Sequence, residues 1–379
     1  MILLSNGGDN ICHSTTPGDE MAIGTVDGVF VLRRGNHGNW FLKHRGLEGI
    51  FVSGLTKLSS GALIAATRGC GIARSDDGGQ TWRWINKGIT QFEFWSVRSG
   101  QIKGHEVVLA GTLPAHLFRS DDEGETWAEL TALRDVATAD RWFFPPPPNQ
   151  GHVKEIVIEG DRIYVGIEVG ALLVSDDGGQ SFTDLNVDPD PVEVDIHRVV
   201  VHPDRPGRII VSNGLVGLQI TEDGGATWSR AKHPTGLDYP EPMVVHPSQP
   251  DLIFLAGAVG WPPHWYRLGR ARGRIARTRD GGRSWDMLLG GLPNGQRAMW
   301  GALTLEAWQE DFALYAADTD GQVFESRDGG DHWLIVAEAA PVSKGDFYRG
   351  LAKDRPRIAN VDDMNFFDAA KDRMGKVTV

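Results

Sequence analysis

The octapeptide SDDGGQTW at residues 75–82 is the first of a series of similar segments along the chain. Five further copies read SDDEGETW, SDDGGQSF, TEDGGATW, TRDGGRSW and SRDGGDHW, and they begin at Ser120, Ser175, Thr221, Thr278 and Ser326. Successive copies start 45, 55, 46, 57 and 48 residues apart. A repeat of this period indicates an array of similar structural units, each with its own copy of the motif.

Each copy has the composition of a tight hairpin turn. The Asp-Gly-Gly centre provides glycines that accept positive φ and an aspartate that can bond to nearby backbone amides. The Ser or Thr at the start, and the hydroxyl residue near the end of most copies, can close further bonds to the backbone. The terminal aromatic residue is a large apolar group that can pack on a neighbouring sheet. A catalytic feature is seldom needed six times, so we interpret the copies as structural.

Short apolar strands precede each copy in a recurring order. One example is a first strand at residues 156–158, a second at 162–166 and a third at 171–174 that runs into the motif. A fourth strand starts at the aromatic residue that ends the motif. Four short strands in 45–57 residues are typical of one propeller blade. The sequence therefore predicts an all-β fold, a seven-bladed β-propeller with four-stranded antiparallel blades.

We expect a single domain over residues 1–379. Residues 1–48 form the first blade, in which GNHGNW at residues 35–40 resembles the motif without its aspartates. The other blades are expected at residues 50–90, 92–140, 152–190, 195–235, 240–292 and 299–340. The tail at residues 341–379 is expected to close the ring or to pack on it, through a strand at 357–361 or a short helix at 366–374.

Composition limits the classes of partner. The chain has 38 Lys and Arg against 50 Asp and Glu, a net charge of −12, whereas nucleic-acid and anionic-membrane binders need a basic face. Residues 267–277 are rich in arginine, but this stretch is too short to form the basic face that such binders need. Two cysteines exclude a disulfide framework, and no secretory signal or membrane-spanning run is recognisable. We expect a cytoplasmic protein without nucleic-acid or membrane partners, and leave its oligomeric state open.

A ligand site is expected at one mouth of the central channel, where loops from many blades converge. First strands begin and second strands end on that face, while the hairpin motifs lie on the opposite face. The candidate catalytic residues at these positions are His152, Glu168, His197, Arg198 and Glu241. The candidate substrate-binding residues are Arg68, Trp95, His116, Tyr239, Trp265 and Trp300.

His152, Glu168 and His197 come from two blades that are adjacent in the ring. Two imidazoles and a carboxylate are typical of a divalent-metal site and equally of an acid–base set. His116 and Glu241 are candidates for a fourth ligand or for an orienting partner. Shared coordination requires the two imidazoles to lie within roughly 8 Å of each other. The alternative is a hydrogen-bonded polar plug of the channel.

Two insertions are expected beside this mouth. Residues 139–152 read ADRWFFPPPPNQGH, and residues 260–274 read GWPPHWYRLGRARGR. A proline run forms a stiff wall, and aromatic and arginine side chains suit a small aromatic, sugar or carboxylate ligand. The alternative is that the insertions cover the ring or form an oligomer contact.

The repeats resemble those of the Asp-box, or BNR, propeller superfamily, which includes sialidases, sortilin-type domains, xyloglucan-cleaving glycosidases and photosystem II assembly factors. The segments at residues 111–127 and 151–182 are most similar to bacterial single-domain BNR-like, or glycosyl-hydrolase-like, proteins. The resemblance covers about residues 20–340, and its motifs imply a fold and not a reaction. Sialidases carry an early Arg-Ile-Pro element and an arginine triad. Residues 357–359 read Arg-Ile-Ala, and no triad can be assembled, so sialidase activity is not expected.

Two functions remain open from the sequence. One is a hydrolase or lyase, with a divalent metal ion as candidate cofactor, that acts on a small polar, sugar-like or aromatic substrate. The other is a non-catalytic binding or assembly platform. A metal or a strongly shifted pKa at the mouth favours chemistry, whereas a mouth occluded by its own loops favours the platform.

Overall fold

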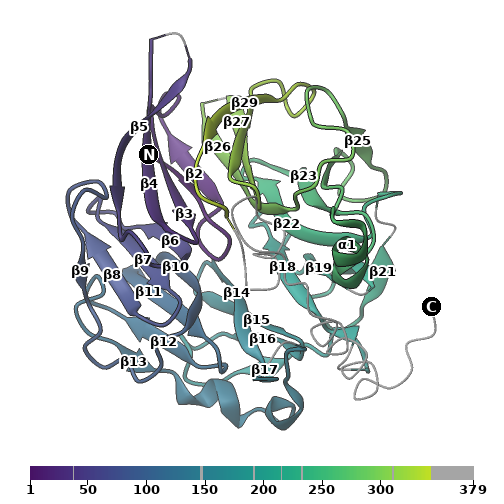
Figure 1. Cartoon of the computed structure of the whole chain (residues 1–379). Helices are drawn as coiled ribbons and strands as arrows, with labels where there is room; N and C mark the ends of the chain where they lie inside the picture. Colours follow the sequence, from purple (N-terminus) through teal and green to yellow (C-terminus); the bar gives the residue numbers. More distant parts are fainter. Residues whose placement is uncertain are drawn as a thin grey trace.

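Seven β-sheets follow one another around a ring in the order of the sequence (Figure 1). This arrangement confirms the predicted all-β, seven-bladed propeller. The computed structural model describes residues 1–342 apart from residues 37, 146–147, 191–192, 215, 232–233 and 310. The strand and the helix predicted within residues 357–374 lie outside the described residues.

Blades 2 to 6 are four-stranded antiparallel sheets, and the first strands of neighbouring blades contact one another around the channel. In blades 2 and 3 the strands are β6 (Val52–Lys57), β7 (Leu63–Thr67), β8 (Gly71–Ser75), β9 (Arg83–Trp84), β10 (Phe94–Ile102), β11 (His105–Thr112), β12 (Leu117–Ser120) and β13 (Ala128–Glu129). In blades 4 to 6 they are β14 (His152–Glu159), β15 (Arg162–Glu168), β16 (Ala171–Ser175), β17 (Thr183–Asp184), β18 (Ile196–Val201), β19 (Ile209–Asn213), β20 (Gly217–Thr221), β21 (Ser229–Ala231), β22 (Tyr239–His246), β23 (Gln249–Ala258), β24 (Arg274–Thr278) and β25 (Asp286–Leu288).

Blades 1 and 7 each contain a strand from the N-terminal segment. Blade 1 consists of β1 (Ile2–Leu4), β3 (Glu20–Thr25), β4 (Gly28–Arg34) and β5 (Trp40–Gly46). Blade 7 consists of β2 (Ile11–Ser14), β26 (Trp300–Trp308), β27 (Asp311–Asp318), β28 (Gln322–Ser326) and β29 (Leu334–Glu338). Both N-terminal strands pair in parallel, β1 with β3 and β2 with β26. The N-terminal segment therefore ties the first blade to the last.

The turn between β1 and β2 crosses the channel. The backbone amide of Gly7 donates to the carbonyl of Ser53 at 2.8 Å, and its carbonyl accepts from Val97 at 2.9 Å. On the other side, the side chain of Asn10 donates to the carbonyl of Met243 at 2.9 Å. These bonds reach blades 2, 3 and 6, so residues 5–10 fill the channel and fix the blades around it.

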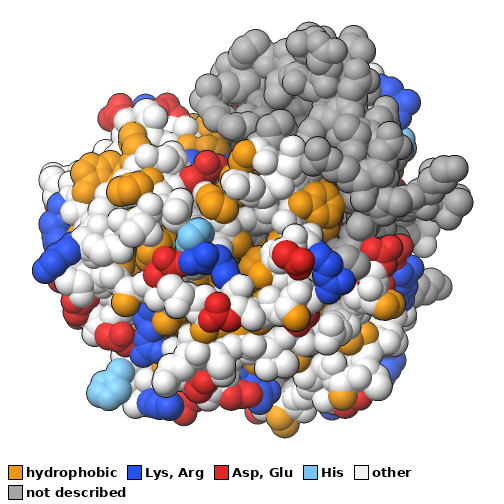
Figure 2. Space-filling model, turned by 90° about the horizontal axis from the view of Figure 1, so that it is seen from below, with side chains coloured by type: hydrophobic (Ala, Val, Ile, Leu, Met, Phe, Trp, Pro, Cys, Tyr) orange, Lys and Arg blue, Asp and Glu red, His pale blue; other side chains and the backbone are white. Residues whose placement is uncertain are grey.

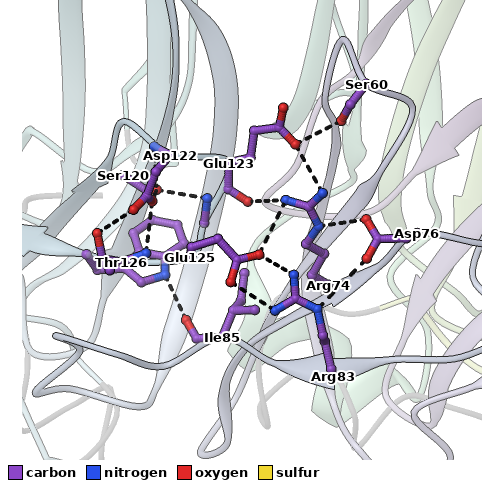
Figure 3. A network of polar contacts seen from close by, with 12 residues as sticks. Ser60, Arg74, Asp76, Arg83, Ile85, Ser120, Asp122, Glu123, Glu125 and Thr126 are labelled. Atoms are coloured by element: carbon purple, nitrogen blue, oxygen red, sulfur yellow. Dashed lines mark hydrogen bonds and ion pairs between the residues drawn. The ribbon is translucent and has the colours of Figure 1, made fainter.

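The repeated motifs are Asp boxes, and Figure 3 shows the one in blade 3. The hydroxyl of Ser120 accepts from the amide of Gly124 and donates to Asp122, both at 2.8 Å. Asp122 also accepts from the amide and the hydroxyl of Thr126, at 2.8 and 2.6 Å. Equivalent bonds recur in the other five boxes, with His332 in place of the last hydroxyl residue in blade 7. The turn itself occupies these carboxylates, in agreement with their structural interpretation.

The box face also joins neighbouring blades. The indole of Trp127 in blade 3 donates to the carbonyl of Ile85 in blade 2 at 2.8 Å. In the reverse direction Arg74 donates to the carbonyl of Glu123 at 2.7 Å and also pairs with its carboxylate (Figure 3). In the same way Arg119 of blade 3 donates to the carbonyl of Gly178 in blade 4 at 2.8 Å. The boxes of blades 3 and 4 therefore stabilise their own turns and also contact the preceding blade.

Helices are few in the described part of the chain, and all lie in the two predicted insertions or beside them. They are α1 (Pro262–Leu268) and the 3₁₀ helices η1 (Thr131–Asp135) and η2 (Ala139–Arg141). None of the helices among the described residues is long and apolar enough to cross a bilayer. On the side of the molecule seen in Figure 2, Lys and Arg side chains are interspersed with Asp and Glu.

Candidate active site at the channel mouth

The first strand of blades 2 to 7 carries a β-bulge close to its start, at the mouth of the channel. One residue in each strand, or two in β22, lies at the bulge, where the register of the strand pairing shifts. These residues are Ser53, Trp95, Lys154, His197, Glu241 with Pro242, and Gly301. A bulge redirects a side chain and is common next to binding sites. Because the first strands surround the channel, this repeated device places one bulge from each of six blades around the mouth.

Three of the bulge residues are charged or titratable and come from adjacent blades. The ammonium of Lys154 lies 3.8 Å from the Glu241 carboxylate. The Nδ1 atom of His197 lies 3.5 Å from the same carboxylate. All three side chains are 2 % exposed or less. The bulges of blades 4, 5 and 6 thus form one side of a buried polar cluster.

Glu168, at the end of β15, lies between two imidazoles. Its Oε2 atom is 3.3 Å from Nε2 of His152, the residue directly opposite it in β14. Its Oε1 atom is 3.7 Å from Nε2 of His197 in the next blade. Lys154 approaches the same carboxylate at 4.0 Å. The structure therefore brings the sequence-predicted residues His152, Glu168 and His197 together, with Glu241 beside them.

Asp195 also belongs to this cluster, and the sequence analysis missed it. It lies one residue before β18, where its backbone forms an isolated bridge with Glu168. Its carboxylate is 3.4 Å from Nε2 of His197. Among the described residues, the ligand atoms of Glu168, Asp195 and His197 all lie within 4.8 Å of one another, and His152 is not part of that group. The sequence prediction took His197 and Arg198 from the residues before the expected first strand and did not select Asp195.

The two imidazoles have different surroundings. Burial lowers the pKa of His152 to about 4, although the neighbouring Glu168 acts in the opposite direction. His152 is therefore neutral at physiological pH. The Nδ1 atom of His197 is 2.6 Å from the carbonyl oxygen of Pro240. A carbonyl can only accept a hydrogen bond, so Nδ1 carries a proton and Nε2 faces the carboxylates.

Aromatic rings flank His152. The indole of Trp95 lies over the imidazole with ring centroids 3.6 Å apart, and Phe144 meets the imidazole edge-on at 4.7 Å. On the indole of Trp95, the guanidinium of Arg68 stacks at 3.3 Å from the ring centroid. The bulge residue of blade 3 and the first insertion thus enclose one side of the site, and Arg68 extends the stack.

A second aromatic pair flanks His197. Its imidazole lies 4.8 Å from the ring of Tyr239, and Tyr239 meets Trp265 edge-on at 5.3 Å. Trp265 is fully buried on α1, and its indole donates to the carbonyl of Val259 at 3.0 Å. Four of the six predicted substrate-binding residues, namely Arg68, Trp95, Tyr239 and Trp265, therefore surround the cluster.

His116 and Trp300 do not join the site. His116 hydrogen-bonds Glu129 on the outer strand β13 at 2.7 Å, because its position at the start of the third strand directs it away from the channel. Trp300 is fully buried in the core between blades, 5.1 Å from Phe324. It precedes the bulge of β26, and only the next residue, Gly301, is redirected to the mouth. The structure therefore places neither of these two predicted substrate-binding residues beside the cluster.

Arg198, a predicted catalytic residue, lies outside the cluster as well. It follows the bulge residue of β18, and the strand's alternation directs it away from the cluster. Its guanidinium pairs with Glu155, which also binds Arg98 at 2.7 Å. Glu155 and Arg98 line a cavity of about 330 Å³ with Asp9 of the N-terminal segment. This buried ion-pair group is separate from the mouth cluster.

The N-terminal segment forms the floor of the cluster. The side-chain oxygen of Asn6 accepts from Lys154 at 3.2 Å, and its amide donates to the carbonyl of Gly301 at 2.7 Å. The floor therefore contacts the bulges of blades 4 and 7, and it separates the mouth from the cavity on the other side.

Comparison with known proteins supports the architecture. A family model described as sortilin, neurotensin receptor 3, matches residues 170–310. A search of the curated proteins found no match. Among solved structures, the GH74 xyloglucanase from Xanthomonas campestris aligns with a TM-score of 0.61 and 19% identity, over 88% of this chain and 55% of the other. An ancestral GH74 enzyme aligns with a TM-score of 0.56 and 14% identity, over 73% of this chain and 37% of the other.

A second kind of neighbour matches along most of both chains. YCF48 bound to D1 peptide aligns with a TM-score of 0.53 and 16% identity, over 86% of each chain. By contrast, the chain spans about half the length of the first glycosidase. At these identities the similarity shows the fold alone. The six boxes, the seven blades and these matches together support a propeller of the BNR-like, or Asp-box, type.

Proposed function

We propose that the protein is a hydrolase or lyase that acts on a small polar, sugar-like or aromatic ligand at the channel mouth. The observation that carries the proposal is the position of Glu168 between the imidazoles of His152 and His197. A carboxylate and two imidazoles within reach of one ligand can accept, donate and relay protons during bond cleavage.

The surroundings of this trio favour a ring-shaped ligand. Trp95 and Tyr239 each pack against one of the imidazoles, and aromatic faces are suited to stacking on sugar or aromatic rings. Arg68 is stacked on Trp95 at the edge of the same group. A planar guanidinium in this position suits a carboxylate on the ligand.

The glycosidase neighbours support a sugar-like ligand only through their fold. The xyloglucanase aligns with most of this chain, but about half of its own length has no counterpart here. A xyloglucan-cleaving activity is therefore not carried over, and the proposal rests on the residues of the mouth.

The second candidate function is a non-catalytic platform that binds an extended peptide. Two observations favour it. YCF48, described as bound to D1 peptide, matches over 86% of each chain. The cluster residues His152, Glu168 and His197 are also 2 % exposed or less, as expected of a mouth that serves as packing and not as a reaction chamber.

Glu168→Gln separates the two functions, with Glu159→Gln as a matched control at the other end of the same hairpin. The assay is turnover of p-nitrophenyl glycosides and esters. Loss of an acid–base group typically costs about 10²–10⁴-fold in rate. We expect such a loss in Glu168→Gln and wild-type turnover in Glu159→Gln. Equal turnover in both variants would exclude Glu168 as the acid–base group, and peptide binding at the mouth without any turnover would favour the platform.

A further inference from the structure

We infer that Glu168, Asp195 and His197 form a binding site for one divalent transition-metal ion at the channel mouth. The inference deepens the proposed function, because such an ion would supply the Lewis acid of the site. It concerns a different set of residues from the trio expected from the sequence, with Asp195 in place of His152.

The spacing of the three ligand atoms fits an ion. Nε2 of His197 lies 3.4 Å from the Asp195 carboxylate and 3.7 Å from the Glu168 carboxylate. Ligands bound at about 2.1 Å in tetrahedral geometry lie about 3.4 Å from one another. All three residues are 7 % exposed or less. All three ligand atoms lie within 4.8 Å of one another, so small side-chain movements would bring them to coordination distance.

The orientation of His197 is that of a metal ligand. Its Nδ1–H donates to the carbonyl of Pro240 at 2.6 Å, and this leaves Nε2 facing the two carboxylates. Metal-bound histidines commonly donate their other ring nitrogen to a carbonyl or carboxylate, and this fixes the tautomer. His152, 3.3 Å from the other oxygen of Glu168, is placed to orient that carboxylate in the same way.

Gly214 packs directly against two of the three ligands. A Cβ atom at this position would lie 2.2 Å from Asp195 Oδ2 and 2.8 Å from His197 Nε2. Its amide hydrogen-bonds the Asp195 backbone carbonyl at 2.9 Å, so the close approach is built into the chain. Gly214→Ala is therefore a variant that crowds the site while all three ligand residues remain.

The donor set indicates the class of metal. One imidazole nitrogen and two carboxylate oxygens suit Zn²⁺ or Mn²⁺, whereas Ca²⁺ and Mg²⁺ prefer oxygen alone. A divalent ion also offsets the repulsion between two buried carboxylates in close proximity. Three protein ligands leave a coordination position for water or for a ligand oxygen.

The test is titration of EDTA-stripped protein with ZnCl₂ and MnCl₂ by isothermal calorimetry, with metal content checked by mass spectrometry. The variants are Asp195→Asn and Gly214→Ala. The matched control is Glu93→Gln, because Glu93 forms the equivalent backbone bridge with Arg68 between blades 2 and 3. We expect one equivalent of metal per wild-type chain and a loss of affinity of roughly 10–100-fold or more in both variants. Glu93→Gln should bind like the wild type.

Failure of wild-type protein to bind either metal would overturn the inference, as would binding that neither variant weakens. If Asp195→Asn does not fold, Gly214→Ala decides alone, since all ligands remain in it. The result is distinguishable from the fate of the proposed function. Metal binding without turnover would support the metal site and contradict the proposed enzymatic function. Turnover by metal-free protein would support the enzymatic function and contradict a catalytic role for the metal.

Discussion

Replacement of Trp127 by alanine tests how the Asp boxes hold the blades together. The indole is 5 % exposed and packs in a core shared by blades 2 and 3. Its Nε1–H donates to the carbonyl of Ile85 in the neighbouring blade. Truncation would leave a cavity between the two sheets and a buried carbonyl without its donor.

We expect Trp127→Ala to lower the free energy of unfolding by roughly 3–5 kcal/mol, the usual cost of truncating a buried aromatic side chain. The lost hydrogen bond accounts for about 1 kcal/mol of that. The control is Trp84→Ala, since Trp84 belongs to the last strand of blade 2 and is 47 % exposed. A surface substitution of this kind should change stability by about 0.5 kcal/mol or less.

The assay is equilibrium urea unfolding followed by far-UV circular dichroism, which does not depend on the removed fluorophore. Equal destabilisation in both variants would refute the role of the box tryptophan as an inter-blade plug. So would a Trp127→Ala variant that keeps its stability and loses ligand or metal binding at the mouth.

Three other perturbations test separate parts of the structure. The Thr81 hydroxyl lowers the pKa of Asp77 to about 2 from 3.8. This carboxylate therefore stabilises the fold above about pH 4 and loses that contribution as the pH falls toward 2. Asp77→Asn should make the free energy of unfolding less dependent on pH in this acidic range. Glu155→Gln breaks a buried pair with Arg98 and Arg198 and should cost roughly 3–5 kcal/mol in urea unfolding. Deletion of residues 1–14 should lower the melting temperature and expose the junction of blades 1 and 7 to limited proteolysis, whereas an unchanged digestion pattern would contradict its role in closing the ring.

The fold was predictable because the Asp box is a local structure. Its hydrogen bonds lie within eight residues, so the sequence of one box is enough to identify its turn. The N-terminal segment shows the opposite case. Its strand β2 pairs in parallel with β26, almost the whole chain away, and no motif in residues 1–14 indicates that partner. The sequence therefore indicated no role for residues 1–14 in closing the ring, and it left open whether residues 341–379 close the ring or pack on it.

The candidate site was predictable in part, and the β-bulges explain both the successes and the errors. His197 and Glu241 are bulge residues, whereas Trp300 and Arg198 lie immediately beside a bulge and point elsewhere. A shift of one residue changes the face on which a strand residue lies. An apolar strand pattern does not reveal which residue forms the bulge. For the same reason the sequence did not indicate that Asp195 faces the mouth.

The metal site of Glu168, Asp195 and His197 is tested most directly by locating the ion itself. Crystals grown with MnCl₂ would be measured at a wavelength where manganese scatters anomalously. We predict a single strong anomalous peak at the mouth, about 2.0–2.3 Å from carboxylate oxygens of Glu168 and Asp195 and from Nε2 of His197. The contrary result is a map with no peak among these three side chains, or with peaks only at surface carboxylates.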